Sequence, residues 1–249
     1  MRVEREARRG LATPLATAVA VAMCMGIARA DTATDDRIKQ RILSKLTGQV
    51  SIHLEGFDVQ VTEGVVRLRG SAGSLGEVKK VERIVGSIPD VAGIASELIV
   101  RPSPVSDAEI AGRVKYALDR RPRFKAAQLQ VSSAGGQVTL DGTVERALDR
   151  LEAGEFAAEV EGVSQVINNL RIRSEGTISP EQVRSRVLSV LTNPLTFGVV
   201  RNLEVEVEGS TVTLYGAVSR PSDLTHAERL CLGVPGVGSV RNLIEVMGG

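Results

Sequence analysis

A short signature of the form V-x-L-x-G occurs three times along this chain at nearly constant spacing. Its closing glycines, which we expect to be structural turn glycines, are Gly70, Gly142 and Gly216, and they stand 72 and 74 positions apart. A second signature, V-x-x-I/V, follows each copy at matching distances and begins at Val91, Val163 and Val237. A fixed period of this size indicates one supersecondary unit that has been copied. The chain is therefore predicted to fold as three small domains.

Residues 1–30 have the layout of a secretory signal peptide. An arginine-rich start precedes an apolar run over 11–27, and small residues occupy both positions that a signal peptidase reads, the second being Ala30. We predict cleavage after Ala30 and a periplasmic location. A permanent membrane span is disfavoured because the run is short and contains Pro14. Arg8 and its neighbouring arginine leave both general and twin-arginine export open.

Removal of this leader changes the charge and the cysteine content of the chain. It takes away five basic and two acidic residues, so 26 basic and 28 acidic residues remain and the formal net charge goes from +1 to −2. A slightly acidic protein has no global attraction for nucleic acid, and peripheral membrane contact would need a local patch. Cys231 alone remains after cleavage, which excludes an intramolecular disulfide.

Each copy is predicted to begin with an amphipathic helix. Apolar residues recur every four positions in all three: Ile38, Ile42 and Leu46; Ile110, Val114 and Leu118; Val183, Val187 and Leu191. Ser106 and Ser179 occupy N-cap positions, and Glu109 and Gln182, three residues later, suit capping boxes. A β-hairpin follows each helix, with glycine-containing turns at 63–64, 134–136 and 208–210.

A second helix and a last strand complete each copy. Four columns of that helix are apolar in every copy: Val81, Ile84, Val85 and Ile88; Ala153, Phe156, Ala157 and Val160; Ala227, Leu230, Cys231 and Val234. The unit is thus αββαβ, a three-stranded sheet with both helices on one face, and the chain is α+β. We place the domains at 34–101, 105–173 and 178–247.

The second and third copies also share a longer ending. It reads Gly162-Val163-x-x-Val166-x-Asn168-Asn169-Leu170 in one and Gly236-Val237-x-x-Val240-x-Asn242 in the other. With the V-x-L-x-G strand and the apolar second helix, this ending resembles the BON domain. The first copy departs from it at Asp90 and Ser96. The resemblance implies an exported, non-enzymatic protein of the bacterial envelope, in a family often described as phospholipid-binding. It carries over no fixed binding residues, because a fold alone does not give a function.

The strongest candidate site lies at the end of the first helix of the second copy and consists of six cations and one phenylalanine. We assign to it Arg113, Lys115, Arg120, Arg121, Arg123, Phe124 and Lys125. At an anionic lipid surface each such cation contributes about 1 kcal/mol, and Phe124 would insert at the interface. The alternative is a solvated loop whose Phe124 covers the core, since charge runs usually face water.

Other residues give no site for a cofactor, a metal or a catalytic step. His226 aligns with Glu152 in a column expected to face solvent, and His53 falls in a loop, so neither has neighbours with which to bind a metal. Cys231 aligns with Ala157 and is expected to be a packed thiol. The sequence contains no nucleophile with a matching base and no phosphate-binding loop, so we expect a protein that is not an enzyme.

Two functions remain open from the sequence. In the first, the three domains dock on anionic phospholipid headgroups or another envelope surface through the basic residues of the second copy. In the second, the chain is a periplasmic protein-interaction or chaperone-like module that binds envelope proteins through strand edges and has no lipid affinity.

Overall fold

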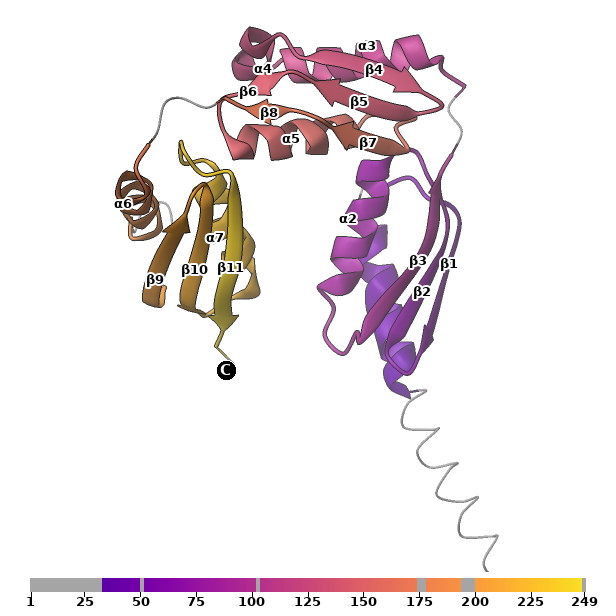
Figure 1. The fold of residues 1–249 in the computed structure, drawn as a ribbon. Coiled ribbons are helices and arrows are strands. Elements are labelled where there is room, and N and C mark those ends of the chain that lie inside the picture. The colour runs from indigo at the N-terminus through magenta and orange to yellow at the C-terminus, as the bar shows by residue number, and fades with distance from the viewer. Residues whose placement is uncertain (1–32, 50–51, 102–103, 174–177, 194–199, 248–249) are drawn as a thin grey trace, which may run out of the picture. The chain divides into compact units, whose positions relative to one another are not determined.

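The computed structural model describes residues 33–49, 52–101, 104–173, 178–193 and 200–247 (Figure 1). The expected leader and its cleavage point after Ala30 lie outside the described residues. The described residues divide into two compact units. One holds those up to Ser71 together with Lys79–Ile99, and the other holds Ala72–Val78 and those from Val100 onward.

The first repeat follows the predicted order of elements. It comprises a helix over 33–47, then β1 (Glu55–Thr62), β2 (Val65–Ala72), α2 (Leu75–Gly86) and β3 (Gly93–Val100). Its sheet has the order β1-β2-β3, and β1 runs antiparallel to β2. The apolar residues of the first helix, Ile38 and Ile42, lie fully inside a core with Val59 and Leu68.

The second repeat has the same order with one addition. It comprises α3 (Asp107–Asp119), α4 (Pro122–Ala127), β4 (Gln130–Ala134), β5 (Gln137–Asp141), β6 (Thr143–Val144), α5 (Ala147–Ala158), β7 (Gln165–Asn168) and β8 (Arg171–Ile172). The strands form the sheet β4-β5-β7, continued by the two-stranded pair β6-β8. The short helix α4 occupies the segment that the sequence suggested to be a loop.

The third repeat comprises α6 (Pro180–Leu191), β9 (Arg201–Glu208), β10 (Thr211–Val218), α7 (Pro221–Leu232) and β11 (Ser239–Val246). Its central strand β10 pairs antiparallel with β9 and parallel with β11. Val187 of α6 and Cys231 of α7 meet Val212 and Leu214 of β10 in one core, so both helices cover the same face of the sheet. The α+β fold with three tandem units is confirmed.

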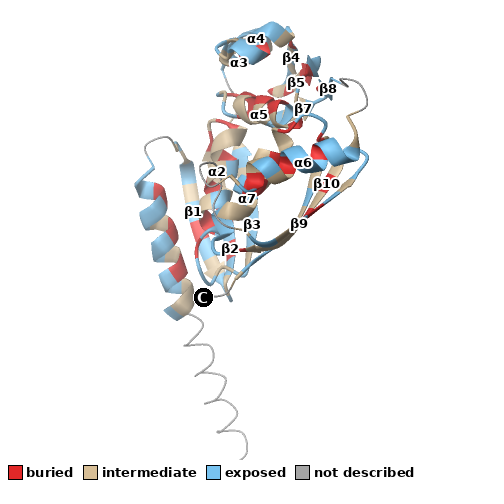
Figure 2. Ribbon diagram, turned by 90° about the vertical axis from the view of Figure 1, so that its left-hand side faces the viewer, coloured by how far each residue is buried: buried red, intermediate tan, exposed pale blue. Residues whose placement is uncertain are grey.

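The buried positions are those that the repeat predicted. The valines that open the V-x-L-x-G signature, Val66, Val138 and Val212, are each 0% exposed. The first and third columns of the second helix are also fully buried: Val81, Ala153 and Ala227; Val85, Ala157 and Cys231. In Figure 2, buried residues alternate with exposed ones along the helices, as expected for helices with one face against a sheet.

The helix starts agree with the capping signals, with one difference. Ser179 and Gln182 form a full capping box, in which each side chain accepts a hydrogen bond from the other residue's backbone N–H, both at 3.3 Å. Ser106 accepts from the Glu109 N–H, also at 3.3 Å, but the Glu109 carboxylate instead accepts from Arg113 at 2.7 Å. Helix α3 therefore begins with half of the expected capping box.

The three signature glycines lie within or between strands rather than in the hairpin turns. Gly70, Gly142 and Gly216 have φ values of 134°, 137° and 144°, a region that other residues rarely adopt. The backbone of the preceding strand also approaches closely here. A Cβ at Gly70 would lie 3.0 Å from the Glu55 carbonyl oxygen, and one at Gly216 would lie 2.9 Å from that of Arg201. At Gly70 and Gly216 the pairing register also shifts, between Glu55 and Asp58 and between Tyr215 and Ala217, so an irregular first strand crosses close to both glycines.

Candidate functional site

Phe124 is the residue that fixes the position of α4. Pro122 stands at the first position of this helix, where its missing N–H costs nothing, and Phe124 enters the core with only 1% of its surface exposed. Its ring makes an edge-to-face contact with Phe156 of α5, with centroids 6.2 Å apart. Phe124 thus has the core-covering position, which was the second of the two alternatives left open by the sequence.

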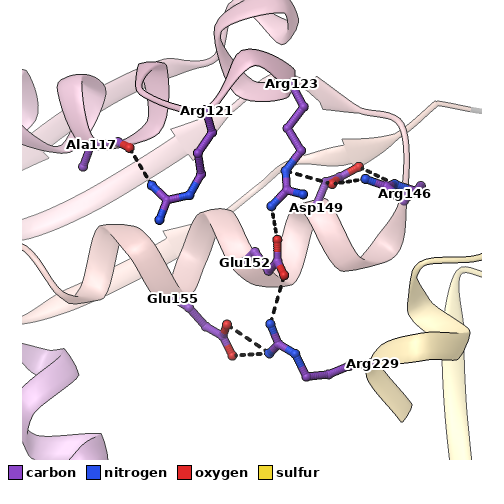
Figure 3. A network of polar contacts seen from close by, with 8 residues as sticks. All are labelled: Ala117, Arg121, Arg123, Arg146, Asp149, Glu152, Glu155 and Arg229. Atoms are coloured by element: carbon purple, nitrogen blue, oxygen red, sulfur yellow. Dashed lines mark hydrogen bonds and ion pairs between the residues drawn. The ribbon is translucent and has the colours of Figure 1, made fainter. Parts of the chain in front are cut away.

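Two of the candidate cations are held by partners within the second domain. The Arg121 guanidinium carbon lies 3.3 Å from the centroid of the Phe156 ring, and its Nη1 donates to the Ala117 carbonyl oxygen at 3.0 Å. Arg123 forms ion pairs with Asp149, at 3.3 Å, and with Glu152. These contacts direct both side chains toward α5 (Figure 3).

Two further cations are paired along the surface of α3. Arg113 contacts Glu109 at 2.7 Å and Glu161 at 3.7 Å, and Lys115 contacts Asp119 at 2.8 Å. The side chains of both cations are about 40% exposed. Exposed pairs of this kind contribute only about 0–1 kcal/mol, so phosphate groups can replace the carboxylates at small cost.

The remaining cations, Arg120 and Lys125, are exposed, and among the described residues neither forms an ion pair. Tyr116 lies one turn before Arg120 on α3 and is 69% exposed. The sequence reasoning missed Tyr116, although its position two residues from the buried Val114 and Leu118 already predicted an outward direction. We give the name basic surface to Arg120 and Lys125, the two candidate cations that are exposed and form no ion pair among the described residues, together with Tyr116.

An alternating chain of charges runs through Arg146, Asp149, Arg123 and Glu152 (Figure 3). Arg146 donates twice to Asp149, at 3.0 Å each, and this hydrogen bonding raises the pKa of Arg146. Asp149 is 3% exposed and also forms an ion pair with Arg123, which in turn forms one with Glu152. The column of Glu152 was expected to face solvent, but its side chain is only 15% exposed because α7 packs nearby. Sequence reasoning missed this network, since its members come from separate elements.

The other candidate residues have structural surroundings. Burial raises the pKa of the Cys231 thiol to about 12, so it stays protonated and unreactive at neutral pH. In the part of the chain that the structure describes, His, Cys, Asp and Glu side chains do not gather in groups of three that would suit a metal ion. Within the same residues, no helix has the length and apolar character needed to cross a bilayer.

The comparison with protein families settles the class of the repeated unit. A model of the BON domain matches residues 34–102, 106–174 and 181–248. The chain belongs to the BON domain family. Its three BON domains account for most of the sequence after the predicted leader.

Two curated proteins resemble part of the BON array. Osmotically-inducible protein Y of Escherichia coli (strain K12) is 29% identical over 148 residues, which are 55% of this chain and 71% of that protein. An uncharacterized protein in the gshII 5' region of Anaplasma centrale is 25% identical over 140 residues, covering 53% of this chain and 93% of that one. Among solved structures, CdsD, a structural protein of the type III secretion system of Chlamydia trachomatis, is 13% identical with a TM-score of 0.25 and covers 86% and 93% of the two chains.

Proposed function

We propose that this protein is an exported, non-enzymatic component of the bacterial envelope whose second BON domain docks on anionic phospholipid headgroups. The observation that carries the proposal is the basic surface: Arg120 and Lys125 are exposed, and exposed Tyr116 stands one turn before Arg120. Membership of the BON family and the likeness to osmotically-inducible protein Y support a place in the envelope and a role in osmotic stress.

The chemistry of the basic surface suits a peripheral contact. A tyrosine ring is stable at the level of lipid headgroups because it has an apolar body and a polar tip. Arg120 and Lys125 would each add about 1 kcal/mol at an anionic surface. Arg121 and Arg123 contribute less, since a phosphate would have to compete with Phe156 and with two carboxylates of α5. Phe124 supports the surface from the core and does not enter the bilayer.

Sedimentation with phosphatidylglycerol vesicles tests this proposal. We expect the protein to bind these vesicles, to ignore neutral phosphatidylcholine vesicles, and to lose at least about ten-fold in affinity when Arg120 and Lys125 are changed to Glu. The matched control is Arg184→Glu with Arg186→Glu, which reverses two exposed cations on the equivalent helix α6. Equal losses in both double variants, or no vesicle binding by the unmodified protein, would rule out this role for the basic surface.

A protein-interaction function is the second candidate, and one observation favours it. Strand β3 lies at an edge of its sheet and exposes Ile94 and Ile99, at 37% and 63%. An edge strand with apolar side chains can pair with an extended segment of another protein. In that case crosslinking in cells would capture the same envelope proteins at low and high salt, and Ile99→Asp would abolish the capture without affecting vesicle binding.

A further inference from the structure

Arg229 of α7, in the third domain, reaches two carboxylates of α5, in the second (Figure 3). Its Nη2 donates to Glu152 at 3.0 Å, and its Nη1 donates to both oxygens of Glu155, at 3.0 and 3.1 Å. Both helices belong to the same compact unit. One guanidinium thus makes charge-assisted hydrogen bonds to two acids on the neighbouring domain.

Contacts within the second domain hold Glu152 in place independently of Arg229. Glu152 is also paired with Arg123, and Arg123 in turn contacts Asp149, whose side chain is 4% exposed. A carboxylate fixed by its own domain loses little side-chain freedom when a second cation binds. Glu152 is 15% exposed and Arg229 is 34% exposed, so the pair is partly shielded from water and stronger than a fully exposed one.

The acids occur at this position in the second repeat only. The residues aligned with Glu152 and Glu155 are Lys80 and Arg83 in the first repeat and His226 and Arg229 in the third. The α5 acids are therefore no requirement of the repeated fold. A local role, complementing the cation on α7, explains them.

We infer that the α5 acids form a docking surface for the third BON domain and that this contact opens as the ionic strength rises. Salt weakens ion pairs because the screening length falls from about 10 Å at 0.1 M to about 3 Å at 1 M. The domains also approach beside the ion pairs, since a Cβ placed on Gly233 at the end of α7 would lie 3.5 Å from the Leu148 Cδ2 of α5. We call the Arg229–Glu152–Glu155 cluster the latch. It makes the spacing of the second and third domains respond to the salt around the protein.

Distance measurements between the two domains test the latch. Fluorescent labels on Ser132→Cys in β4 and Ser185→Cys in α6, both exposed sites, would report the separation in a full chain carrying Cys24→Ser and Cys231→Ala. Alanine is compatible with position 231 because Ala157 fills the equivalent buried position. We expect one short distance at 0.05 M salt and a shift of the closed-to-open ratio on the order of ten-fold at 1 M salt.

Neutral variants separate the latch from general charge effects. Arg229→Gln leaves the second domain unchanged and should open the pair at 0.05 M salt, as should Glu155→Gln. Arg220→Gln is the control, since Arg220 contacts Asp223 of its own helix at 3.1 Å and should leave the pair closed. The inference is overturned if salt does not change the distance, if Arg229→Gln stays closed, or if Arg220→Gln opens the domains equally.

Discussion

The side-chain amide of Asn168 donates a hydrogen bond to the backbone carbonyl oxygen of Arg150, at 2.7 Å. The Oδ1 of the same side chain accepts from the Leu170 N–H at 3.3 Å, so one asparagine ties the last strand to the second helix. In the third domain Asn242 makes the same two contacts, with Leu224 at 2.9 Å and Ile244 at 3.2 Å. The asparagine in the shared ending of these two repeats thus has a structural task.

Replacement of Asn168 by Ala should destabilise the second domain by about 1 kcal/mol, the usual net value of such hydrogen bonds. Urea denaturation with amide exchange read out in α5 measures the loss. Asn169→Ala is the control, because among the described residues the side-chain amide of Asn169 donates to the exposed Asp141 carboxylate alone, at 3.1 Å. Equal losses from both variants would contradict the structural role of Asn168.

Phe124→Ala should lower the free energy of unfolding of the second domain by about 3–5 kcal/mol, since it removes a fully buried ring. Tyr116→Ala should change it by less than about 0.5 kcal/mol, because Tyr116 is exposed. Denaturant unfolding of the two variants makes the comparison. If Phe124→Ala left stability intact, the ring would not be part of the core.

The Asp107 carboxylate should make the stability of the second domain depend on acid pH. Backbone N–H groups of Gly136 and Gly135 and the Ser133 hydroxyl donate to it, at 3.0, 2.8 and 2.7 Å, and hold the pKa of Asp107 below its ordinary value. Asp35 accepts from the equivalent hairpin of the first domain in the same way, at 2.9 Å.

The pKa of Asp107 is lower in the folded state than in the unfolded state, so the ionised carboxylate stabilises the domain at pH values above the unfolded-state pKa. This stabilisation is lost as the pH falls through the folded-state pKa. We therefore expect Asp107→Asn to be less stable than the unmodified protein at pH 7 and the difference to shrink below about pH 4. Urea titrations at several pH values measure it. Asp119→Asn, which removes a surface acid, should show a smaller difference, and a constant gap for Asp107→Asn would contradict the assignment.

Cys231 should resist thiol reagents in the folded protein. It is 0% exposed and its pKa is raised to about 12, so both access and the thiolate form are missing at neutral pH. Mass spectrometry after iodoacetamide treatment should find Cys231 modified only in denaturant, while a cysteine at the exposed position of Ser132 reacts at once. Rapid labelling of both sites would disprove the packed position.

The repeated core was predictable because each of its columns carries its signal three times. Val66, Val138 and Val212 share a chemistry and a spacing that only a common buried position explains, and the structure confirms it. The helix α4 was missed because its six residues are too few to show a helical period. Pro122 at its start was the available sign, since proline favours the first position of a helix.

The partners of the cations were not predictable from the sequence. Arg123 forms ion pairs with Asp149 and Glu152, which lie 26 and 29 positions later in the chain. Glu152 also accepts a hydrogen bond from Arg229, a further 77 positions on. Such pairs depend on how α4, α5 and α7 pack, and no local pattern encodes that. The charges counted in the sequence therefore could not show which cations of the group are held by partners, as Arg121 and Arg123 are.

Because the described residues form three separate hydrophobic clusters, one per repeat, we expect this protein to melt in more than one transition. Each cluster can come apart while the others stay intact, so heating should yield overlapping calorimetric transitions instead of one sharp peak. A substitution that unfolds one domain should then leave the other two folded.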